Sequence, residues 1–228
     1  MPQQAELLVS AKNAPPPHRL LAAALGVGVE RRARIGLLGG SFNPAHAGHL
    51  HISHEALKRF KLDEVWWLVS PQNPLKERAG MAPLAERVKA ARKVASGDRR
   101  LRVTDLESRL GTYYTVDTLA KLRARLPRLK FVWLMGADNL LQLAHWKNWP
   151  GIFAQAPIAV FDRPTYSARA SSALAAQRFA AARVAPSAVF CRLPAWCLIR
   201  AKLNPASATA IRTGRGKSTK KVTPSPAK

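Results

Sequence analysis

The sequence predicts an α/β fold in which one domain is built on a doubly wound parallel sheet. Short apolar runs typical of buried strands alternate along the chain with longer segments of helical periodicity. A chain of 228 residues, 47% of them hydrophobic, is long enough to give one such domain a full core. His46, the loop around Asn73, and Asp138 each follow a predicted strand. Ligands of open parallel sheets bind beyond the carboxyl ends of the strands, so we expect one cleft to collect these residues.

The first half of the predicted sheet follows from two apolar runs and the amphipathic segments around them. The run 35–38 is followed by two glycines, and the aromatic run 65–69 has the composition of a buried strand whose paired tryptophans belong to the core. A loop punctuated by prolines follows the second run. In chain order, the elements expected here are a strand at 35–38, a helix at 50–60, a strand at 65–69, a loop at 71–78, a helix at 84–95 and a strand at 101–103.

The second half of the chain alternates in the same way. Pro127 ends a helix, because proline cannot continue the backbone hydrogen bonds. The run 130–135 is the clearest later strand. In chain order, the elements expected here are a helix at 116–126, a strand at 130–135, a polar helix carrying Trp146 and Trp149, a strand at 158–161, an alanine-rich helix at 171–183 and strands at 189–193 and 196–203.

Positive charge dominates the composition, with 37 Lys and Arg against 13 Asp and Glu and a formal net charge of +24. Most of this excess lies between the two ends of the chain. A basic body suits anionic nucleotide substrates and leaves a nonspecific affinity for nucleic acid open. Residues 214–228 have the composition of a disordered tail. We expect the domain to span 34–213, with an N-terminal extension at 1–33.

The chain is expected to be cytoplasmic. No uninterrupted apolar run approaches the roughly 18 residues that cross a bilayer. The apolar stretch 20–29 is followed by Glu30 and several arginines, which fits an N-terminal extension better than a signal peptide. Cys191 and Cys197 have a spacing that fits neither common zinc nor redox motifs, so we expect core thiols and no metal site.

The most informative segment is 39–49, Gly-Gly-Ser-Phe-Asn-Pro-Ala-His-Ala-Gly-His, between the first strand and the first helix. Its two leading glycines allow positive φ and a close backbone approach. His46 and His49 stand three residues apart at the predicted helix start, so both imidazoles can share one face. The N–H groups and the positive dipole end of a helix start attract phosphate, and Gly48 leaves room for it. The segment therefore predicts a phosphoryl site.

At these residues the chain resembles a superfamily of nucleotidyltransferases with the signature Gly-x-Phe-x-Pro-x-His-x-Gly-His, and within it the bacterial nicotinate-nucleotide adenylyltransferases. The fixed positions are occupied by Phe42, Pro44, His46, Gly48 and His49. A second signature, Ser-x-Thr-x-(Ile/Leu)-Arg, is matched by Ser207, Thr209, Ile211 and Arg212. Without the resemblance, the second segment reads as an ordinary capped helix start.

The resemblance implies a Rossmann-like nucleotidyltransferase fold and adenylyl transfer from ATP to nicotinate mononucleotide. The products would be nicotinate adenine dinucleotide (deamido-NAD) and pyrophosphate, in a step of NAD biosynthesis. Positioning and charge stabilisation carry such in-line phosphoryl transfer, and Mg²⁺ is expected to arrive with ATP. The implied catalytic residues are His46 and His49, acting on the α-phosphate, and Arg212, holding pyrophosphate.

The resemblance also implies two sets of ligand contacts. Those to ATP are Gly39, Gly40, Ser41, Phe42, Gly48, Gly136, Asp138, Ser207 and Thr209. Those to nicotinate mononucleotide are Asn73, Lys76, Thr115 and Trp146. Simpler interpretations exist for three of them: Lys76 as a solvated lysine, Asp138 as a helix cap and Trp146 as a half-exposed core aromatic.

Three other functions compete with this one. A sibling enzyme would use nicotinamide mononucleotide, phosphopantetheine or a cytidylyl donor. A class I tRNA synthetase shares the His-x-Gly-His element, but this chain has no Lys-Met-Ser-Lys-Ser loop. A basic nucleic-acid-binding module with a degenerate nucleotide fold is favoured only by the net charge. The sequence leaves a homo-oligomer open.

Overall fold

The computed structural model describes residues 32–71, 80–162 and 170–200, and these form one six-stranded sheet. The strands are β1 (Ala33–Gly40), β2 (Glu64–Val69), β3 (Leu101–Thr104), β4 (Leu129–Gly136), β5 (Ile158–Phe161) and β6 (Trp196–Ile199). They lie in the order β3-β2-β1-β4-β5-β6, and every neighbouring pair is parallel. This confirms the doubly wound parallel sheet, whose strand order reverses beside the central strand β1.

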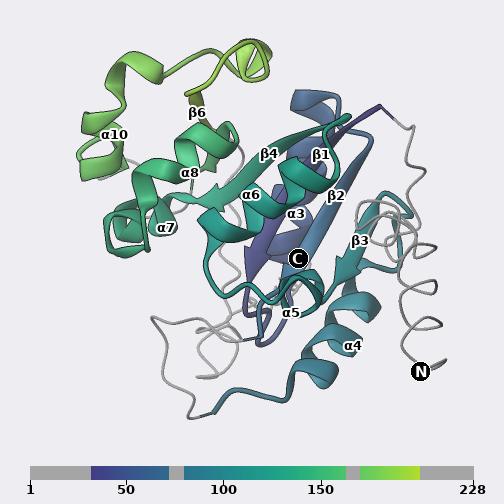
Figure 1. Ribbon diagram of the computed structural model, residues 1–228. Helices are drawn as coiled ribbons and strands as arrows, with labels where there is room; N and C mark the ends of the chain where they lie inside the picture. The colour runs from purple at the N-terminus through teal and green to yellow at the C-terminus, as the bar shows by residue number, and fades with distance from the viewer. Residues whose placement is uncertain (1–31, 72–79, 163–169, 201–228) are drawn as a thin grey trace, which may run out of the picture.

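Helices cover both faces of the sheet, as Figure 1 shows with α6 crossing in front of the strands and α3 behind them. One face is covered by α3 (Ala47–Phe60) and α4 (Leu84–Ala95). The other is covered by α5 (Leu106–Leu110), α6 (Thr115–Arg125), α7 (Ala137–Gln142), α8 (Trp149–Gln155) and α10 (Leu174–Arg178). Three short 3₁₀ turns complete the described elements: η1 (Leu143–His145), η2 (Ala180–Ala182) and η3 (Pro186–Ala188).

The core is divided by the sheet into two layers. Every residue of β2 is buried, as expected for a parallel strand covered on both faces. Trp66 packs in the layer beneath α5 and α6, whereas Trp67 packs beneath α3 and α4. Both indoles are fully buried, which confirms that the paired tryptophans belong to the core.

Two helical predictions were too long. The polar helix expected around Trp146 and Trp149 is divided into α7, η1 and α8, and Asn148 takes the left-handed conformation (φ 43°) just before α8. The alanine-rich helix expected over 171–183 is only α10 followed by η2. In contrast, α4 and β5 have the predicted bounds.

The strand predicted over 189–193 is wrong. These residues follow η3 in turns, and only Val189 among them is buried. The run is apolar, but Pro186 starts a 3₁₀ turn before it and Pro194 follows it, and proline has no N–H to donate to a strand. The prediction of two core thiols is also wrong in part. Cys197 is buried in β6, where burial raises the pKa of its thiol to about 12, but Cys191 is exposed.

The expected tail at 214–228 and nearly all of the expected extension at 1–33 lie outside the described residues. Within the described ranges, no helix is long and apolar enough to cross a membrane.

Candidate active site

The two signature histidines lie at the carboxyl end of the central strand, where β1 passes into α3. His46 is the N-cap residue of α3, and His49 lies in its first turn. Their ring centroids are 4.0 Å apart, which confirms that both imidazoles share one face of the helix start.

Each histidine caps the backbone of the helix start through its Nδ1 atom. The N–H of Gly48 donates to His46 Nδ1 at 3.0 Å, and the N–H of His46 donates to His49 Nδ1 at 3.1 Å. The two side chains therefore form a reciprocal capping box, with histidine in place of the usual hydroxyl and carboxylate. An accepting nitrogen carries no proton, so each neutral imidazole carries its proton on Nε2. Each ring is thus in the tautomer whose Nε2–H can donate a hydrogen bond to an anion.

The glycines of the signature differ from expectation. Gly39 and Gly40 belong to β1, and neither has a positive φ; the left-handed residue of this turn is Phe42 (φ 48°). A Cβ on Gly39 would collide with the Trp133 ring, whereas one on Gly40 would meet only Phe42, whose ring is 3.5 Å away. The structure therefore requires glycine at position 39 for packing. The contacts of Gly39, Gly40, Ser41, Phe42 and Gly48 with ATP stay a prediction.

Phe42 tolerates its left-handed backbone because its side chain is held in the core. Its ring is buried and stacks on Trp67 with 5.1 Å between centroids, and the centroid of the His49 ring lies 4.6 Å from it. A left-handed bulky residue costs about 1–3 kcal/mol, and this packing offsets the cost.

The neighbouring strand β4 brings a second predicted segment to the same edge of the sheet. Leu38 pairs with Leu134, so Gly136 at the end of β4 lies at the level where β1 ends. Gly136 is the N-cap residue of α7, and Asp138 lies in the first turn of that helix. Asp138 is therefore not the helix cap of the simpler interpretation. Its contact with adenosine stays a prediction.

The two described residues expected to contact the acceptor lie on segments that touch each other. Thr115 is the first residue of α6, and Trp146 follows η1. Lys147, next to Trp146, places its Nζ 3.3 Å from Asp117 Oδ2 and 4.5 Å from the centroid of the Tyr114 ring. Trp146 is half-buried and packs on the core, so both interpretations of this side chain fit its position.

The remaining site predictions fall on Asn73, Lys76, Ser207, Thr209 and Arg212, which lie outside the described residues. Over the described ranges, no group of three or more His, Cys, Asp or Glu side chains could hold a metal ion.

Comparison with known proteins gives the chain its family. A cytidylyltransferase-like family model matches residues 37–214. A relative in Cereibacter sphaeroides named "Probable nicotinate-nucleotide adenylyltransferase" is 54% identical over 183 residues, which cover 79% of this chain and 98% of the relative. A relative of the same name in Methylorubrum extorquens is 51% identical over 184 residues, which cover 79% of this chain and 99% of the relative.

The chain belongs to the nicotinate-nucleotide adenylyltransferase family. A solved structure supports the fold: that of Plasmodium falciparum nicotinic acid mononucleotide adenylyltransferase complexed with NaAD has a TM-score of 0.62 at 15% identity. The match covers 83% of this chain and 87% of that chain. The nucleotidyltransferase signature at 39–49 lies in the predicted fold, at the carboxyl end of the central strand of this nicotinate-nucleotide adenylyltransferase family member.

Sequence reasoning missed Arg87, a buried cation beside the adenylyltransferase signature. Its guanidinium donates to four backbone carbonyls, those of Ser41 at 2.7 Å, Ser70 at 2.9 Å, Pro71 at 3.1 Å and Ala82 at 2.8 Å. Burial lowers the pKa of this side chain. The signal was present in the sequence, because Arg87 occupies an apolar-stripe position of α4 with Val88, Ala91 and Ala95.

A buried carboxyl group lies next to the segment that carries Thr115. Glu107 of α5 is 5% exposed, and its Oε1 is 3.4 Å from the Thr118 hydroxyl. That hydroxyl is also 2.8 Å from Thr112 Oγ1 and 3.2 Å from the carbonyl of Tyr114. Burial raises the pKa of the Glu107 carboxyl to about 7, although the Thr118 hydrogen bond acts in the opposite direction. This cluster joins α5 to the start of α6.

Glu107 is expected to make the stability of this adenylyltransferase fold depend on pH. Between pH 4.5 and about 7, the folded protein keeps a proton that the unfolded chain has lost, so stability falls as pH rises through this window. The glutamine side chain of Glu107→Gln is neutral at every pH, so this variant should lack the fall. By linkage, the fall in the free energy of unfolding amounts to roughly 3 kcal/mol at most. Urea unfolding of both proteins at pH 5 and pH 8 measures it. Identical pH dependence in the two proteins would show that Glu107 is not the group responsible.

Proposed function

We propose that this chain transfers the adenylyl group of ATP to nicotinate mononucleotide, giving nicotinate adenine dinucleotide and pyrophosphate. The observation that carries the proposal is the histidine capping box at the end of β1, which holds two imidazoles with ring centroids 4.0 Å apart at a helix start, each accepting a backbone N–H at Nδ1. Membership of the nicotinate-nucleotide adenylyltransferase family supplies the reaction. The Plasmodium falciparum enzyme of similar fold is complexed with NaAD, which supports this choice of product.

The chemistry follows from where charge gathers. The 5′-phosphate of the acceptor attacks the α-phosphorus of ATP, a bond to the bridging oxygen breaks, and pyrophosphate leaves with that electron pair. His46 and His49 would donate hydrogen bonds to the α-phosphate and the bridging oxygen as their negative charge rises. Arg212, with the hydroxyls of Ser207 and Thr209, would hold the departing pyrophosphate. These roles need no protein nucleophile.

Mg²⁺ would be held chiefly by the phosphates of ATP and by water. Magnesium commonly keeps several waters and is carried by substrate phosphates, where it neutralises developing charge. Such an arrangement asks the chain for no carboxylate cage of its own.

Acceptor choice is the first test of the proposed function. The nicotinate ring bears a carboxylate where nicotinamide bears a neutral amide, and donors arranged for the charge stay unpaired with the amide. We expect at least ~10²-fold higher kcat/KM with nicotinate mononucleotide than with nicotinamide mononucleotide. Pyrophosphate release from ATP, measured with a panel that includes phosphopantetheine, checks this. Equal kcat/KM with both mononucleotides would contradict a preference for nicotinate mononucleotide. Pyrophosphate release only with another acceptor would assign the specificity of a sibling enzyme.

One basic feature of the described chain favours a second, weaker candidate, nonspecific binding of nucleic acid. The lining of a cavity of about 360 Å³ at the edge strand β3 includes four arginines and one aspartate: Arg92, Arg99, Arg102, Arg109 and Asp98. Arg102 pairs with Glu64 and Arg109 pairs with Asp105, which removes part of this positive charge. If the pyrophosphate assay fails with every acceptor and a labelled oligonucleotide binds with steep salt dependence, nucleic-acid binding becomes the better explanation.

A further inference from the structure

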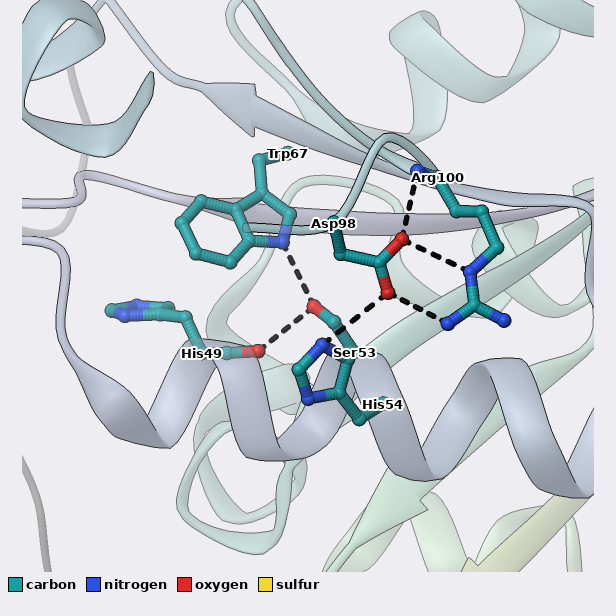
Figure 2. Close-up of polar contacts among 6 residues, drawn as sticks. All are labelled: His49, Ser53, His54, Trp67, Asp98 and Arg100. Atoms are coloured by element: carbon teal, nitrogen blue, oxygen red, sulfur yellow. Dashed lines mark hydrogen bonds and ion pairs between the residues drawn. The ribbon is translucent and has the colours of Figure 1, made fainter. Parts of the chain in front are cut away.

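Two fully buried side chains tie the first turn of α3 to the strand beneath it. The indole Nε1 of Trp67, in β2, donates to the Ser53 hydroxyl at 2.8 Å. That hydroxyl donates in turn to the backbone carbonyl of His49 at 2.8 Å, as Figure 2 shows. Trp67 and Ser53 are both 0% exposed. We call these two consecutive hydrogen bonds the buried tie. The tie ends on the backbone carbonyl of His49, one of the two signature histidines.

Ring packing reaches the same histidine by a second route. The Trp67 ring stacks on Phe42, with 5.1 Å between centroids and 17° between planes. Both rings also lie against the imidazole of His49. The distance between ring centroids is 4.6 Å for Phe42 and 5.7 Å for Trp67. Trp67 therefore contacts the ring of His49 directly and, through Ser53, holds its backbone.

Part of this arrangement has an ordinary structural explanation. A helical serine often donates to the carbonyl four residues earlier, and a buried tryptophan N–H needs an acceptor. Neither habit requires the serine that accepts from the tryptophan to be the one that donates to the carbonyl of a signature histidine. A displacement of about 1 Å in a group that contacts the reacting atoms can cost ~10²-fold in rate. A tie that fixes both the backbone and the ring of His49 is therefore expected to act on turnover.

We propose that Trp67 and Ser53 are positioning residues that hold His49 against the reacting phosphate. The proposal rests on the proposed function for its kinetic readout. Periodicity places Ser53 on the apolar face of α3 and Trp67 in a buried strand, but it does not show which hydrogen-bond partner either side chain meets.

The neighbouring residue His54 offers a matched control. It lies on the same helix, with 52% of its side chain exposed, and its Nε2 is 3.5 Å from Asp98 Oδ2. Asp98 in turn pairs with Arg100 at 2.7 Å, and the hydrogen bond from Arg100 lowers the pKa of the Asp98 carboxyl to about 2. Figure 2 shows this surface pair beside the buried tie, so His54→Ala removes a polar contact of α3 without touching the tie.

The experiment compares Trp67→Phe, which keeps a ring but removes the N–H donor, with Ser53→Ala and with the two combined. Each single change is expected to lower kcat by about 10-fold with KM for both substrates within about two-fold. The combined change should be no worse than the larger single effect, because both break one tie. His54→Ala should match the wild type.

A background lacking His49 separates positioning from general stability. In His49→Ala protein, Trp67→Phe should produce no further fall in kcat, because the group it positions is gone. A further fall of the same size would overturn the proposal, as would normal kcat in both single variants. If Ser53→Ala does not fold, Trp67→Phe in the two backgrounds still decides.

The imidazole resonances of His49 in NMR spectra give a readout that needs no activity. Ser53→Ala, which removes the hydroxyl of the tie and no aromatic ring, should shift them, and His54→Ala should leave them in place. If the wild type releases no pyrophosphate with any acceptor, the proposed function fails while these resonances still test the tie. Unchanged His49 resonances in Ser53→Ala would overturn the positioning role whatever the activity.

Discussion

Replacing His49 with alanine is expected to lower turnover by about 10²-fold or more, with little change in the affinity for ATP. His49 Nδ1 is occupied as an acceptor of the His46 N–H, so its Nε2–H is the group that we expect to meet charge on the phosphate. A donor preorganised for the transition state contributes mainly to kcat, since the ground-state phosphate carries less charge at that point. Steady-state kinetics of pyrophosphate release measures the effect, and ATP binding is measured separately by titration.

His46→Ala is the companion variant, and it carries a structural cost of its own. The His46 side chain caps the N–H of Gly48, and losing an N-cap costs about 1 kcal/mol. Thermal unfolding of both variants measures the loss of stability separately from the loss of turnover. His54→Ala serves again as the exposed control. Near-normal turnover in both folded variants would remove the catalytic assignment of the two histidines.

Replacing Arg87 with methionine is expected to destabilise the protein by about 3 kcal/mol and to lower turnover as well. The guanidinium donates to four carbonyls that belong to three separate stretches of chain, at Ser41, at 70–71 and at Ala82. Hydrogen bonds from a charged group are worth about 1.5–3 kcal/mol each, and relief of the buried charge offsets only part of their loss. Turnover should fall because the carbonyl of Ser41 lies within the segment expected to bind phosphate.

Arg87→Lys tests the reason for this effect. Lysine keeps the charge but has three donors and no planar fork, so it cannot satisfy four acceptors in this geometry. Urea unfolding should place it between the wild type and Arg87→Met. Lys89 of the same helix is exposed, and Lys89→Met is the matched control for loss of a cation from α4. A loss of stability in Arg87→Met no greater than in Lys89→Met would show that the four hydrogen bonds contribute little.

The sequence alone predicted the sheet, its main helices and the helix start that carries the two histidines. Parallel strands covered on both faces read as unbroken apolar runs, so 65–69 and 158–161 could be recognised directly. The capping histidines could be placed because a helix start is a local feature, set by residues within one turn. The strand prediction at 189–193 failed because it rested on the apolar composition of the run and did not consider Pro186 and Pro194, which flank it.

Only the tertiary structure decided which polar residues support the site. Arg87 and Ser53 lie on the buried stripes of α4 and α3, and their partners are separated from them by up to 46 residues in the chain. The need for glycine at position 39 comes from the Trp133 ring on the neighbouring strand. Periodicity shows which face a side chain takes, but hydrogen-bond partners are chosen by the packing of elements that are distant in sequence.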